Sequence, residues 1–323
     1  MNVLVTGGAG FIGSHVAKAL SRAGHVPVVF DSLHNGKQEA VLWGEMIKGD
    51  VRDTAQLSEV IRTNGIEAVI HLAGLIEVGE SVKDPLSFYE TNTAGSLSVA
   101  RAMLANGVKY LVFSSTAAVY GSPVSEYLKE DHITQPVNPY GWSKLAAERI
   151  FLEASATGGL RVVPLRYFNA AGADPEGELG ENHNPETHLI PRACLAVKGD
   201  IPALTVFGDD WSTPDGTCVR DYVHVTDLAS AHIKALEYLV KGGESRPFNL
   251  GTGKGYSVRE IIAAVSEAAH LPVPHAFAAR REGDPAVLVA DSGDAKAILG
   301  WQPEHSSLKE LCTTAWKWFS RVE

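Results

Sequence analysis

A tyrosine and a lysine four residues apart, Tyr140 and Lys144, have the spacing needed for acid–base chemistry. Positions i and i+4 share one face of a helix, so the ammonium group can stand beside the phenol. A nearby cation lowers the pKa of a tyrosine toward neutrality and makes it a usable base. The run Ser114-Ser115-Thr116 ends an apolar stretch about 24 residues before Tyr140, and Thr116 or a neighbouring serine could donate to a substrate oxygen. Hydroxyl groups at such a place also cap strand ends, which is the alternative for these three residues.

A glycine-rich turn near the N-terminus predicts a phosphate-binding site. Gly7, Gly10 and Gly13 follow the spacing GxxGxxG, and Gly8 with the last two follows GxGxxG. Glycine permits a tight turn and lets the backbone approach a pyrophosphate, which then rests on the N-terminus of the following helix. A glycine triplet alone is weak evidence, because any tight turn needs glycine. The apolar run before this turn and the helical pattern after it favour a dinucleotide site that includes Phe11 and Ile12 within the turn.

Two acids follow the next predicted strands. Asp31, eighteen residues after Gly13, is placed to accept hydrogen bonds from the adenosine ribose hydroxyls. A carboxylate there repels a 2′-phosphate, so NAD is favoured over NADP as the cofactor. Asp50 and Val51, at the end of the following strand, are expected near the adenine edge. Capping of the next turn is the alternative for Asp50.

The elements that must position these residues alternate along the chain. Apolar runs of strand length occupy residues 1–6, 26–30, 45–49, 67–72 and 110–114, and helical patterns occupy residues 55–63, 85–105 and 139–156. Continuously apolar strands that alternate with helices indicate a parallel sheet covered on both faces. With right-handed crossovers, the predicted fold class is α/β, a Rossmann-type doubly wound parallel sheet with a smaller mixed α/β substrate-binding domain.

The composition changes after residue 168. Residues 170–223 are rich in Gly, Pro, Asp and Asn, and helical periodicity returns at residues 225–238, 258–269 and 308–319. We therefore expect residues 1–168 plus about 224–251 to form the NAD-binding domain. Residues from about 169 to 223 and from 252 to 323 are expected to form mainly the substrate-binding domain.

The overall charge and composition exclude several classes of partner. The formal net charge of the 323 residues is −10, with no run of Lys or Arg, which argues against nucleic acid. The N-terminus lacks a basic and apolar leader, and no apolar run reaches about 18 residues, so no membrane association is expected. Three widely spaced cysteines favour the reducing cytoplasm. The twelve histidines show no HExxH or HxH cluster, so no metal site is expected.

Several longer motifs carry a resemblance. In the first half they are Thr6-Gly7-Gly8-Ala9-Gly10-Phe11-Ile12-Gly13-Ser14-His15, Leu72-Ala73-Gly74, Tyr140-Gly141-Trp142-Ser143-Lys144 and Arg166-Tyr167-Phe168-Asn169. In the second half they are Val206-Phe207-Gly208, Asp215-Gly216-Thr217-Cys218-Val219-Arg220-Asp221-Tyr222-Val223-His224-Val225 and Arg280-Arg281-Glu282-Gly283-Asp284. Together they resemble the extended short-chain dehydrogenase/reductase superfamily and, within it, the UDP-galactose 4-epimerases (UDP-glucose 4-epimerases). The resemblance covers essentially the whole chain.

The resemblance implies a mechanism and a cofactor. A tightly held NAD takes a hydride from C4 of a UDP-hexose while Tyr140 removes the 4-hydroxyl proton. The 4-keto sugar then turns over about its diphosphate linkage, and the hydride returns to the opposite face, which interconverts UDP-galactose and UDP-glucose. By the same resemblance, Lys144 tunes Tyr140 and holds the nicotinamide ribose, and Thr116 hydrogen-bonds the sugar oxygen.

The resemblance also implies further binding residues. Additional cofactor contacts would come from Leu72, Ala73, Gly74, Asn92, Ser114 and Tyr167. The UDP-sugar would be bound by Asn169, His188, Leu189, Phe207, Arg220, Arg281 and Asp284, with Phe207 near the uracil and Asp284 on the uridine ribose. Guanidinium groups suit a diphosphate, although an interdomain ion pair is the alternative for each arginine. A homodimer through residues 85–105 and 139–156 is implied as well.

Departures from the family pattern leave the substrate open. Many relatives carry Lys at the position of Ile76, and some carry Asn at the position of His188. Leu288 occupies the position that gates the room around the sugar C2 substituent, so a UDP-N-acetylhexosamine or a UDP-pentose is an alternative substrate. Dehydration is disfavoured, because the two alanines after Thr116, Ala117 and Ala118, cannot transfer protons. A non-catalytic NAD-binding protein would be expected to lack Tyr140 or Lys144.

Overall fold

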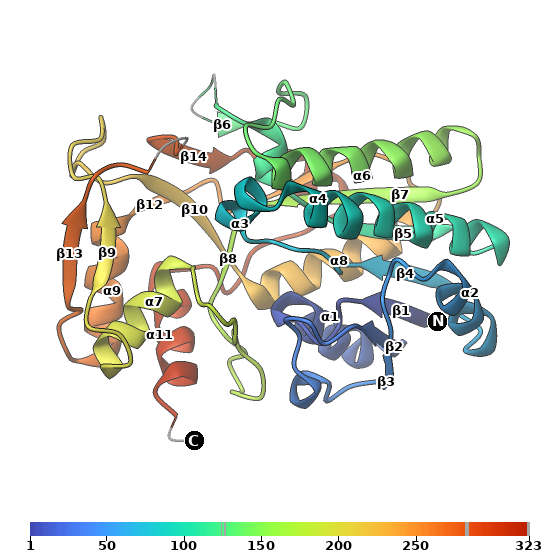
Figure 1. Cartoon of the computed structure of the whole chain (residues 1–323), viewed down its shortest axis with the longest axis horizontal. Coiled ribbons are helices and arrows are strands. Elements are labelled where there is room, and N and C mark those ends of the chain that lie inside the picture. Colours follow the sequence, from blue (N-terminus) through green and yellow to red (C-terminus); the bar gives the residue numbers. More distant parts are fainter. Residues whose placement is uncertain (124, 126, 282–283, 322–323) are drawn as a thin grey trace.

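The computed structural model describes residues 1–123, 125, 127–281 and 284–321 of the chain. Its largest unit is a seven-stranded sheet with helices on both faces (Figure 1). In spatial order the strands are β11 (Phe248–Leu250), β7 (Arg161–Tyr167), β5 (Tyr110–Thr116), β4 (Ala68–His71), β1 (Asn2–Thr6), β2 (Val26–Asp31) and β3 (Glu45–Lys48). All of these strands pair in parallel, which confirms the predicted α/β doubly wound fold.

The order of the strands shows where a ligand can bind. The chain starts near the middle of the sheet at β1, builds outward through β2 and β3, and then crosses to β4 on the other side. The register places Thr6 beside His71 across this reversal and Thr116 beside Tyr167 further along the same edge. Doubly wound sheets bind ligands outside the carboxyl ends of the strands at such a reversal. These residues therefore mark the edge that carries the site.

Two apolar cores sandwich the sheet. Alternate residues of β1 point to opposite faces, so that Val3 and Val5 pack in one core and Leu4 in the other. The first core includes residues of α1 (Phe11–Arg22) and α8 (Val225–Val240), which pack against each other. The second core includes residues of α2 (Thr54–Thr63), α5 (Gly95–Ala105) and α6 (Pro139–Ala156). Burial on both faces explains why the strands are continuously apolar.

The helix expected over residues 85–105 is a succession of shorter elements. After α3 (Val78–Lys83), the chain forms α4 (Pro85–Phe88), a π-helical turn η2 (Tyr89–Ala94) and then α5. Asn92 lies in the π-helical turn, where its amide accepts from the Leu75 N–H at 2.8 Å and donates to the Leu75 carbonyl at 3.0 Å. The predicted helical pattern over residues 85–105 is therefore confirmed, and the structure adds a π-helical turn within it, which periodicity does not reveal.

The smaller region of the molecule is assembled from segments that are far apart in the sequence. Its sheet runs in the order β12 (Gly255–Ser257), β10 (Val219–His224), β14 (Val287–Ala290) and β6 (Tyr127–Leu128), with β8 (Asn169–Ala171) also paired to β10. A separate parallel pair is formed by β9 (Leu204–Phe207) and β13 (His275–Ala278). Three helices of this region pack together at the lower left of Figure 1: α7 (Leu189–Lys198), α9 (Val258–Ala269) and α11 (Leu308–Phe319).

Part of the C-terminal region returns to the large sheet. After β14, helix α10 (Gly293–Ile298) contributes Ala295 to the first core, together with Leu299 and Trp301. The indole of Trp301 is fully buried and donates to the Asp227 carbonyl at 2.9 Å. The domain boundaries given above remain a prediction. Residues 293–301 fall in the range predicted mainly for the substrate-binding domain, but they pack against the core of the large sheet. Two short 3-10 turns, η1 (Gln38–Ala40) and η3 (Ala117–Tyr120), complete the described elements.

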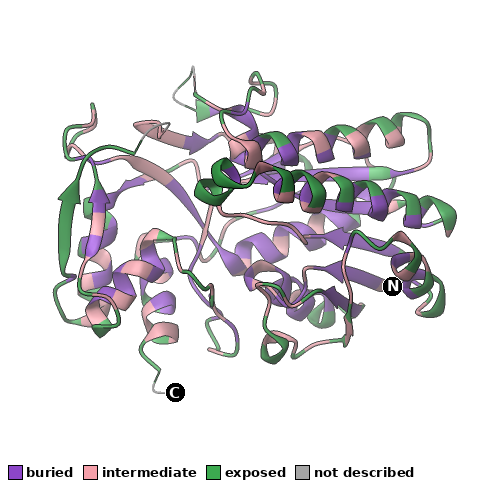
Figure 2. Cartoon of the chain, viewed as in Figure 1, coloured by how far each residue is buried: buried purple, intermediate pink, exposed green. Residues whose placement is uncertain are grey.

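Burial follows the same division. Figure 2 shows the strands of the large sheet mostly buried, whereas β13 at the far side is exposed along its length. Within the described residues no helix is long and apolar enough to cross a membrane. Cys194, Cys218 and Cys312 are free thiols.

Candidate active site

The glycine turn brings the first and fourth strands of the chain into close backbone contact. Gly7 has a φ of 72°, and a Cβ on it would lie 2.6 Å from the backbone nitrogen of Ala73. A Cβ on Gly13 would overlap the carbonyl oxygen of Gly7. Both positions therefore require glycine for steric reasons. The turn packs directly against the predicted cofactor residues Leu72 and Ala73, which follow β4.

The N-terminus of α1 is open for an anion. Its N-cap is Gly10, with no side-chain cap and no acidic residue in the first turn, as far as the described residues extend. The N–H groups of Phe11, Ile12 and Gly13 begin the helix and have no partner within it. Such a row of donors, together with the helix dipole, fits a pyrophosphate. These residues therefore fit the cofactor that the sequence predicts.

Asp31 is fixed beside this turn. Its carboxylate is 8% exposed and accepts hydrogen bonds from Ala9 N–H at 3.0 Å and Leu33 N–H at 2.8 Å. Burial raises the pKa of Asp31, and the two N–H groups oppose that shift. The acid therefore stands next to the open helix end, as a ribose ligand would need to.

Asp50 and Val51 follow β3. Asp50 accepts from the backbone N–H of Arg52 at 2.9 Å and from its guanidinium at 2.6 Å, so this acid closes a local turn. Val51 packs in the second core. The adenine contact of both residues stays a prediction.

A third group of predicted cofactor residues meets around Gly74. A Cβ on Gly74 would lie 2.8 Å from Oδ1 of Asn92 and 3.2 Å from Nζ of Lys144. Asn92 is 2% exposed and uses its amide to bridge Leu75 and the hydroxyl of Ser143. Its side chain therefore positions the backbone around Gly74 and the start of α6, which is the support that a cofactor contact at this place requires.

The predicted catalytic residues lie together at the carboxyl end of β5 and the first turn of α6. Lys144 is 2% exposed, and its Nζ donates to the Ser114 carbonyl at 3.0 Å. The hydroxyl of Ser114 is hydrogen-bonded to Tyr167, which pairs with Thr116 in the neighbouring strand. The Thr116 hydroxyl interacts with Tyr140 and accepts from Ala118 N–H at 3.1 Å. The sheet register thus gathers five sequence-predicted residues at one place.

Burial dominates the electrostatics of both the tyrosine and the lysine. Burial raises the pKa of Tyr140, and its contact with Thr116 only partly opposes that shift. Burial also lowers the pKa of Lys144 to about 8, against the pull of Glu148. Neither shift includes a contribution from the other group, so the tuning of Tyr140 by Lys144 stays a prediction.

A buried ion pair that the sequence analysis missed supports this group. Glu148 lies one helical turn after Lys144 on α6, and its carboxylate accepts from the Arg166 guanidinium at 2.7 Å. Both side chains are at most 6% exposed, and the Ser115 hydroxyl donates to the same carboxylate. Arg166 also donates to the Tyr120 hydroxyl at 3.0 Å. The i, i+4 spacing from Lys144 to Glu148 was the one local signal, since the partner is on β7.

The residues predicted for the uridine end form a second group. The Arg281 guanidinium donates to both carboxylate oxygens of Asp284, at 3.0 and 3.1 Å, and stands 5.7 Å from the ring centre of Phe207. Arg281 is 64% exposed and Phe207 43% exposed. Glu282 and Gly283, from the same motif, lie outside the described residues. This group is thus present, but its charges neutralise each other.

Asn169 and Arg220 are on neighbouring strands. β8 runs parallel to β10, and the Asn169 amide donates to the Asp221 carbonyl at 2.8 Å. Arg220 donates to the Val219 carbonyl at 2.9 Å, and no carboxylate of the described residues pairs with it. For Arg220, the described residues therefore do not support an interdomain ion pair, which was the alternative to diphosphate binding.

His188 and Leu189 lie at the start of α7. His188 is the N-cap of α7, and its Nδ1 lies 2.8 Å from a carboxylate oxygen of Glu181. Leu189 packs against the core of the smaller region. Their role in substrate binding stays a prediction.

Comparisons with known proteins agree on one family. A model of the NAD dependent epimerase/dehydratase family matches residues 3–251. A UDP-glucose 4-epimerase of Rhizobium leguminosarum bv. trifolii is 51% identical over 319 residues, which are 99% of this chain and 97% of that protein. The crystal structure of UDP-glucose 4-epimerase from Brucella ovis in complex with NAD is 48% identical, covers 98% of both chains and has a TM-score of 0.97. A UDP-glucose-4-epimerase from Stenotrophomonas maltophila, with bound NAD and formylated UDP-arabinopyranose, is 41% identical with a TM-score of 0.96 and covers 99% of this chain and 98% of its own.

Proposed function

The chain belongs to the NAD dependent epimerase/dehydratase family, and from this premise we propose that it interconverts UDP-galactose and UDP-glucose by inversion at C4. It is an NAD-dependent isomerase that acts on a UDP-sugar. The observation that carries the proposal is the meeting of Thr116, Tyr140 and Lys144 beside the open N-terminus of α1 at one edge of the sheet.

The side chains divide the work as follows. Tyr140 accepts the proton of the 4-hydroxyl and returns it to the 4-oxygen after the sugar has turned over. Thr116 holds that oxygen through its hydroxyl, and Lys144 keeps a positive charge near the phenolate. NAD, when bound by the glycine turn and Asp31, supplies the hydride acceptor for C4 and the hydride donor for the opposite face. The cofactor is restored in every cycle, so no added oxidant is consumed.

The same edge of the sheet supports epimerisation over dehydration. Elimination across C5 and C6 needs an additional acid and base next to Thr116. The two residues that follow are Ala117 and Ala118, and the N–H of Ala118 is bonded to the Thr116 hydroxyl at 3.1 Å. Neither residue offers a group that can transfer a proton.

Proton NMR tests the function directly. The purified chain is incubated with UDP-galactose and no added NAD, and the anomeric signal of UDP-glucose is followed. We expect UDP-glucose to appear up to the equilibrium ratio, because the resemblance implies a tightly held NAD that purifies with the protein. Product that appears only after NAD is added would mean weak retention, and no product in either case would contradict the proposal.

A UDP-N-acetylhexosamine or a UDP-pentose is the alternative substrate. Leu288, which the resemblance places at the gate for the C2 substituent, packs on the small apolar cluster that includes Ala117 and Val119. Its position beside the end of β5 supports a role in the fit of the sugar. We expect Leu288→Ala to raise kcat/KM for UDP-N-acetylglucosamine relative to UDP-glucose, and an unchanged ratio would remove Leu288 as the gate.

We further propose that the chain forms a homodimer through the helices around residues 85–105 and 139–156. Large apolar side chains are exposed on these helices: Leu86 at 71%, Tyr89 at 39%, Leu97 at 36%, Leu104 at 46% and Trp142 at 43%. Large exposed apolar side chains on neighbouring helices are typical of an interface between subunits. Sedimentation should show a dimer for the wild type and for Leu271→Glu, and a monomer for Leu97→Glu.

The free thiols support a reducing cytoplasm as the place of action.

A further inference from the structure

Four potential metal ligands lie within eight residues, in the segment that connects β8 to α7. They are Glu181, His183, Glu186 and His188, and we call them the 181–188 cluster. One ligand atom of each residue lies within 4.8 Å of those of all the others. Oε1 of Glu181 is 3.0 Å from Nδ1 of His183 and 2.8 Å from Nδ1 of His188. Glu186 approaches the same two nitrogens at 3.7 and 3.1 Å.

The cluster contains buried polar atoms without hydrogen-bond partners. The side chain of Glu186 is 7% exposed, and its Oε2 accepts no hydrogen bond. Nδ1 of His183 is likewise buried without a hydrogen bond of acceptable geometry. Glu181 is 3% exposed, so both carboxylates are largely removed from solvent, whereas the His188 side chain is 43% exposed. Oε1 of Glu186 accepts from the N–H groups of Thr187 and His188, whereas its Oε2 has no hydrogen bond, and a cation between the four groups would satisfy that oxygen.

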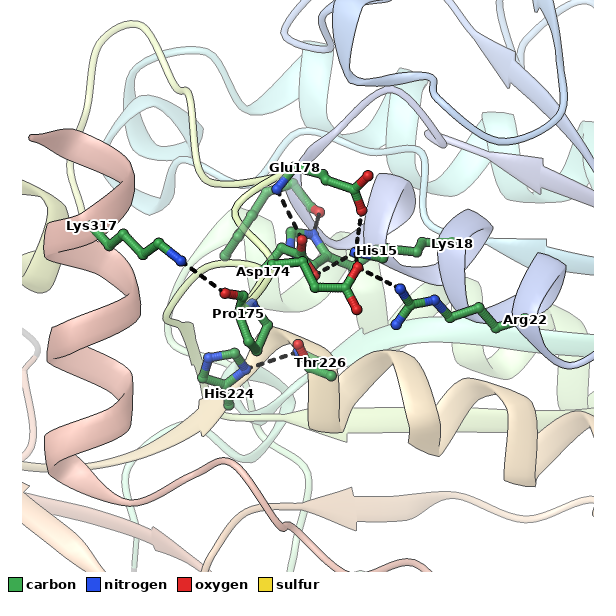
Figure 3. Close-up of polar contacts among 11 residues, drawn as sticks. His15, Lys18, Arg22, Asp174, Pro175, Glu178, His224, Thr226 and Lys317 are labelled. Atoms are coloured by element: carbon green, nitrogen blue, oxygen red, sulfur yellow. Dashed lines mark hydrogen bonds and ion pairs between the residues drawn. The ribbon is translucent and has the colours of Figure 1, made fainter. Parts of the chain in front are cut away.

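A neighbouring cluster on the same connecting segment shows the contrast. Asp174, Glu176 and Glu178 surround Nζ of Lys18, at 2.7, 3.0 and 2.7 Å. Figure 3 shows Lys18 and Arg22 extending from α1 toward this segment. These carboxylates therefore have a cation supplied by the protein. Among the described residues, no lysine or arginine forms an ion pair with the carboxylate of Glu181 or Glu186, although the Arg192 guanidinium donates to the Glu186 backbone carbonyl at 3.2 Å.

We propose that the 181–188 cluster binds one divalent transition-metal ion, with two imidazole nitrogens and two carboxylate oxygens as ligands. Zinc is the ion that this donor set suits best, because it takes His nitrogen and Glu oxygen in tetrahedral sites. Bonds of about 2.1 Å place tetrahedral ligands about 3.4 Å apart, and the distances in the cluster bracket that value. Two carboxylates, two neutral imidazoles and one divalent ion give a site with no net charge. The proposal revises the expectation from the sequence that no metal is bound.

The position of the cluster gives the ion a structural role. The ring of His183 packs edge-on against Phe11 at the start of α1, with ring centres 6.4 Å apart. The Glu181 carbonyl accepts from the Trp318 indole of α11 at 3.0 Å, and His188 caps α7. An ion here would tie the first turn of the cofactor helix to two helices of the smaller region, α7 and α11. This inference does not depend on which sugar the enzyme converts.

Protonation of the two histidines is the alternative to a metal ion for neutralising the charge of the two carboxylates. Burial alone would lower the pKa of His183, but contacts with Glu181 and Glu186 outweigh it and raise the pKa to about 9. Two imidazolium groups would then neutralise the two carboxylates without a metal. The two states differ in metal content and in the response to a chelator, and both can be measured.

The test measures zinc per chain on the full-length protein after removal of any histidine tag. The protein is stripped with a chelator, dialysed against Zn²⁺ and then against buffer, and analysed by plasma mass spectrometry. Glu181→Gln and His183→Phe remove one ligand each while keeping the shape of the side chain and the ring contact with Phe11. Glu178→Gln is the matched control, since it removes a carboxylate from the neighbouring Lys18 cluster.

We expect about one Zn²⁺ per chain in the wild type and in Glu178→Gln, and at least roughly tenfold weaker binding in the two ligand variants. Cobalt bound to the wild type and to Glu178→Gln should show the visible absorption of a tetrahedral site. The chelator should lower the melting temperatures of these two proteins and leave those of the ligand variants unchanged. Wild type that takes up no zinc, or ligand variants that keep it, would overturn the proposal. If a ligand variant fails to fold, the zinc content and chelator response of the wild type alone still decide between metal and protons.

Discussion

Two groups of predicted site residues differ in how far they are buried. The catalytic group consists of Thr116, Tyr140 and Lys144, and the uridine group consists of Phe207, Arg281 and Asp284. In the catalytic group Thr116 is 8% exposed and Lys144 is 2% exposed. Thr116 ends strand β5 of the large sheet, and Lys144 is on helix α6, which packs on that sheet. In the uridine group Arg281 is 64% exposed and is paired with Asp284 on the same loop. From the roles proposed for the two groups, we infer that the catalytic residues are preorganised and that the nucleotide site is completed only when the substrate binds.

The energetics of the two groups support this division. An exposed ion pair such as that of Arg281 and Asp284 contributes about 0–1 kcal/mol, so a diphosphate can displace it at little cost. A buried group cannot change partners in this way, because any intermediate leaves a charge without solvent or partner. We therefore expect substitutions in the catalytic group and its support to affect turnover or folding, and substitutions in the uridine group to affect binding.

Replacing the base should give the largest effect. Tyr140→Phe removes the phenolic oxygen but keeps the ring and its edge-on contact with Phe88. We expect turnover of UDP-galactose to fall roughly 10²–10⁴-fold, which is the range for the loss of a general base, with little change in melting temperature. Steady-state kinetics and thermal unfolding measure the two quantities. Near-normal turnover would mean that another group takes the proton.

Breaking the buried support should mainly affect stability. Glu148→Gln leaves the Arg166 guanidinium buried without its carboxylate, and we expect a loss of about 3–5 kcal/mol in the free energy of unfolding. Urea denaturation measures it, with Glu153→Gln on the exposed side of α6 as the control. Equal stabilities of the two variants would contradict the view that the ion pair fixes the catalytic helix.

Much of the catalytic group could be predicted from sequence because its signals are local. The glycine spacing and the Tyr140–Lys144 spacing each lie within one turn or one helix, and the strand ends follow from apolar runs. The partner of Glu148 is on β7, a strand that the pattern analysis did not assign, and β6 joins a sheet whose other strands come from residues 169 onward. The uridine group and the second sheet depend on such distant pairings, which no local periodicity encodes. The 181–188 cluster was missed because its spacing, Glu-x-His-x-x-Glu-x-His, matches neither histidine pattern that was sought.

Acid should expose the burial of the catalytic edge. His71 is fully buried between Thr6 and Ser96, and burial, assisted by the charge of Lys144, lowers its pKa to about 3. The unfolded chain binds a proton near pH 6.5, so stability from this group is present above that pH and is lost as the pH falls toward 3. Between pH 7 and pH 5 the loss from His71 alone is about 2 kcal/mol.

The pH dependence of His71→Asn measures this contribution. The difference in unfolding free energy between pH 7 and pH 5 should be smaller in this variant than in the wild type by about 2 kcal/mol. His275→Asn, on the exposed strand β13, should keep the wild-type difference. Identical pH dependence in all three proteins would show that His71 carries its proton in the folded state.

The smallest effect is expected in the uridine group. Arg281→Gln removes a charge that reaches solvent, so the free energy of unfolding should change by less than about 0.5 kcal/mol. The same change removes a guanidinium suited to the diphosphate, and KM for UDP-galactose should rise roughly tenfold with kcat nearly unchanged. Arg246→Gln, which breaks another partly exposed pair, with Asp294, should leave both constants as they are. A fall in kcat without a rise in KM would mean that Arg281 acts in turnover and not in binding. The catalytic group and the uridine group would then not differ in the way inferred above.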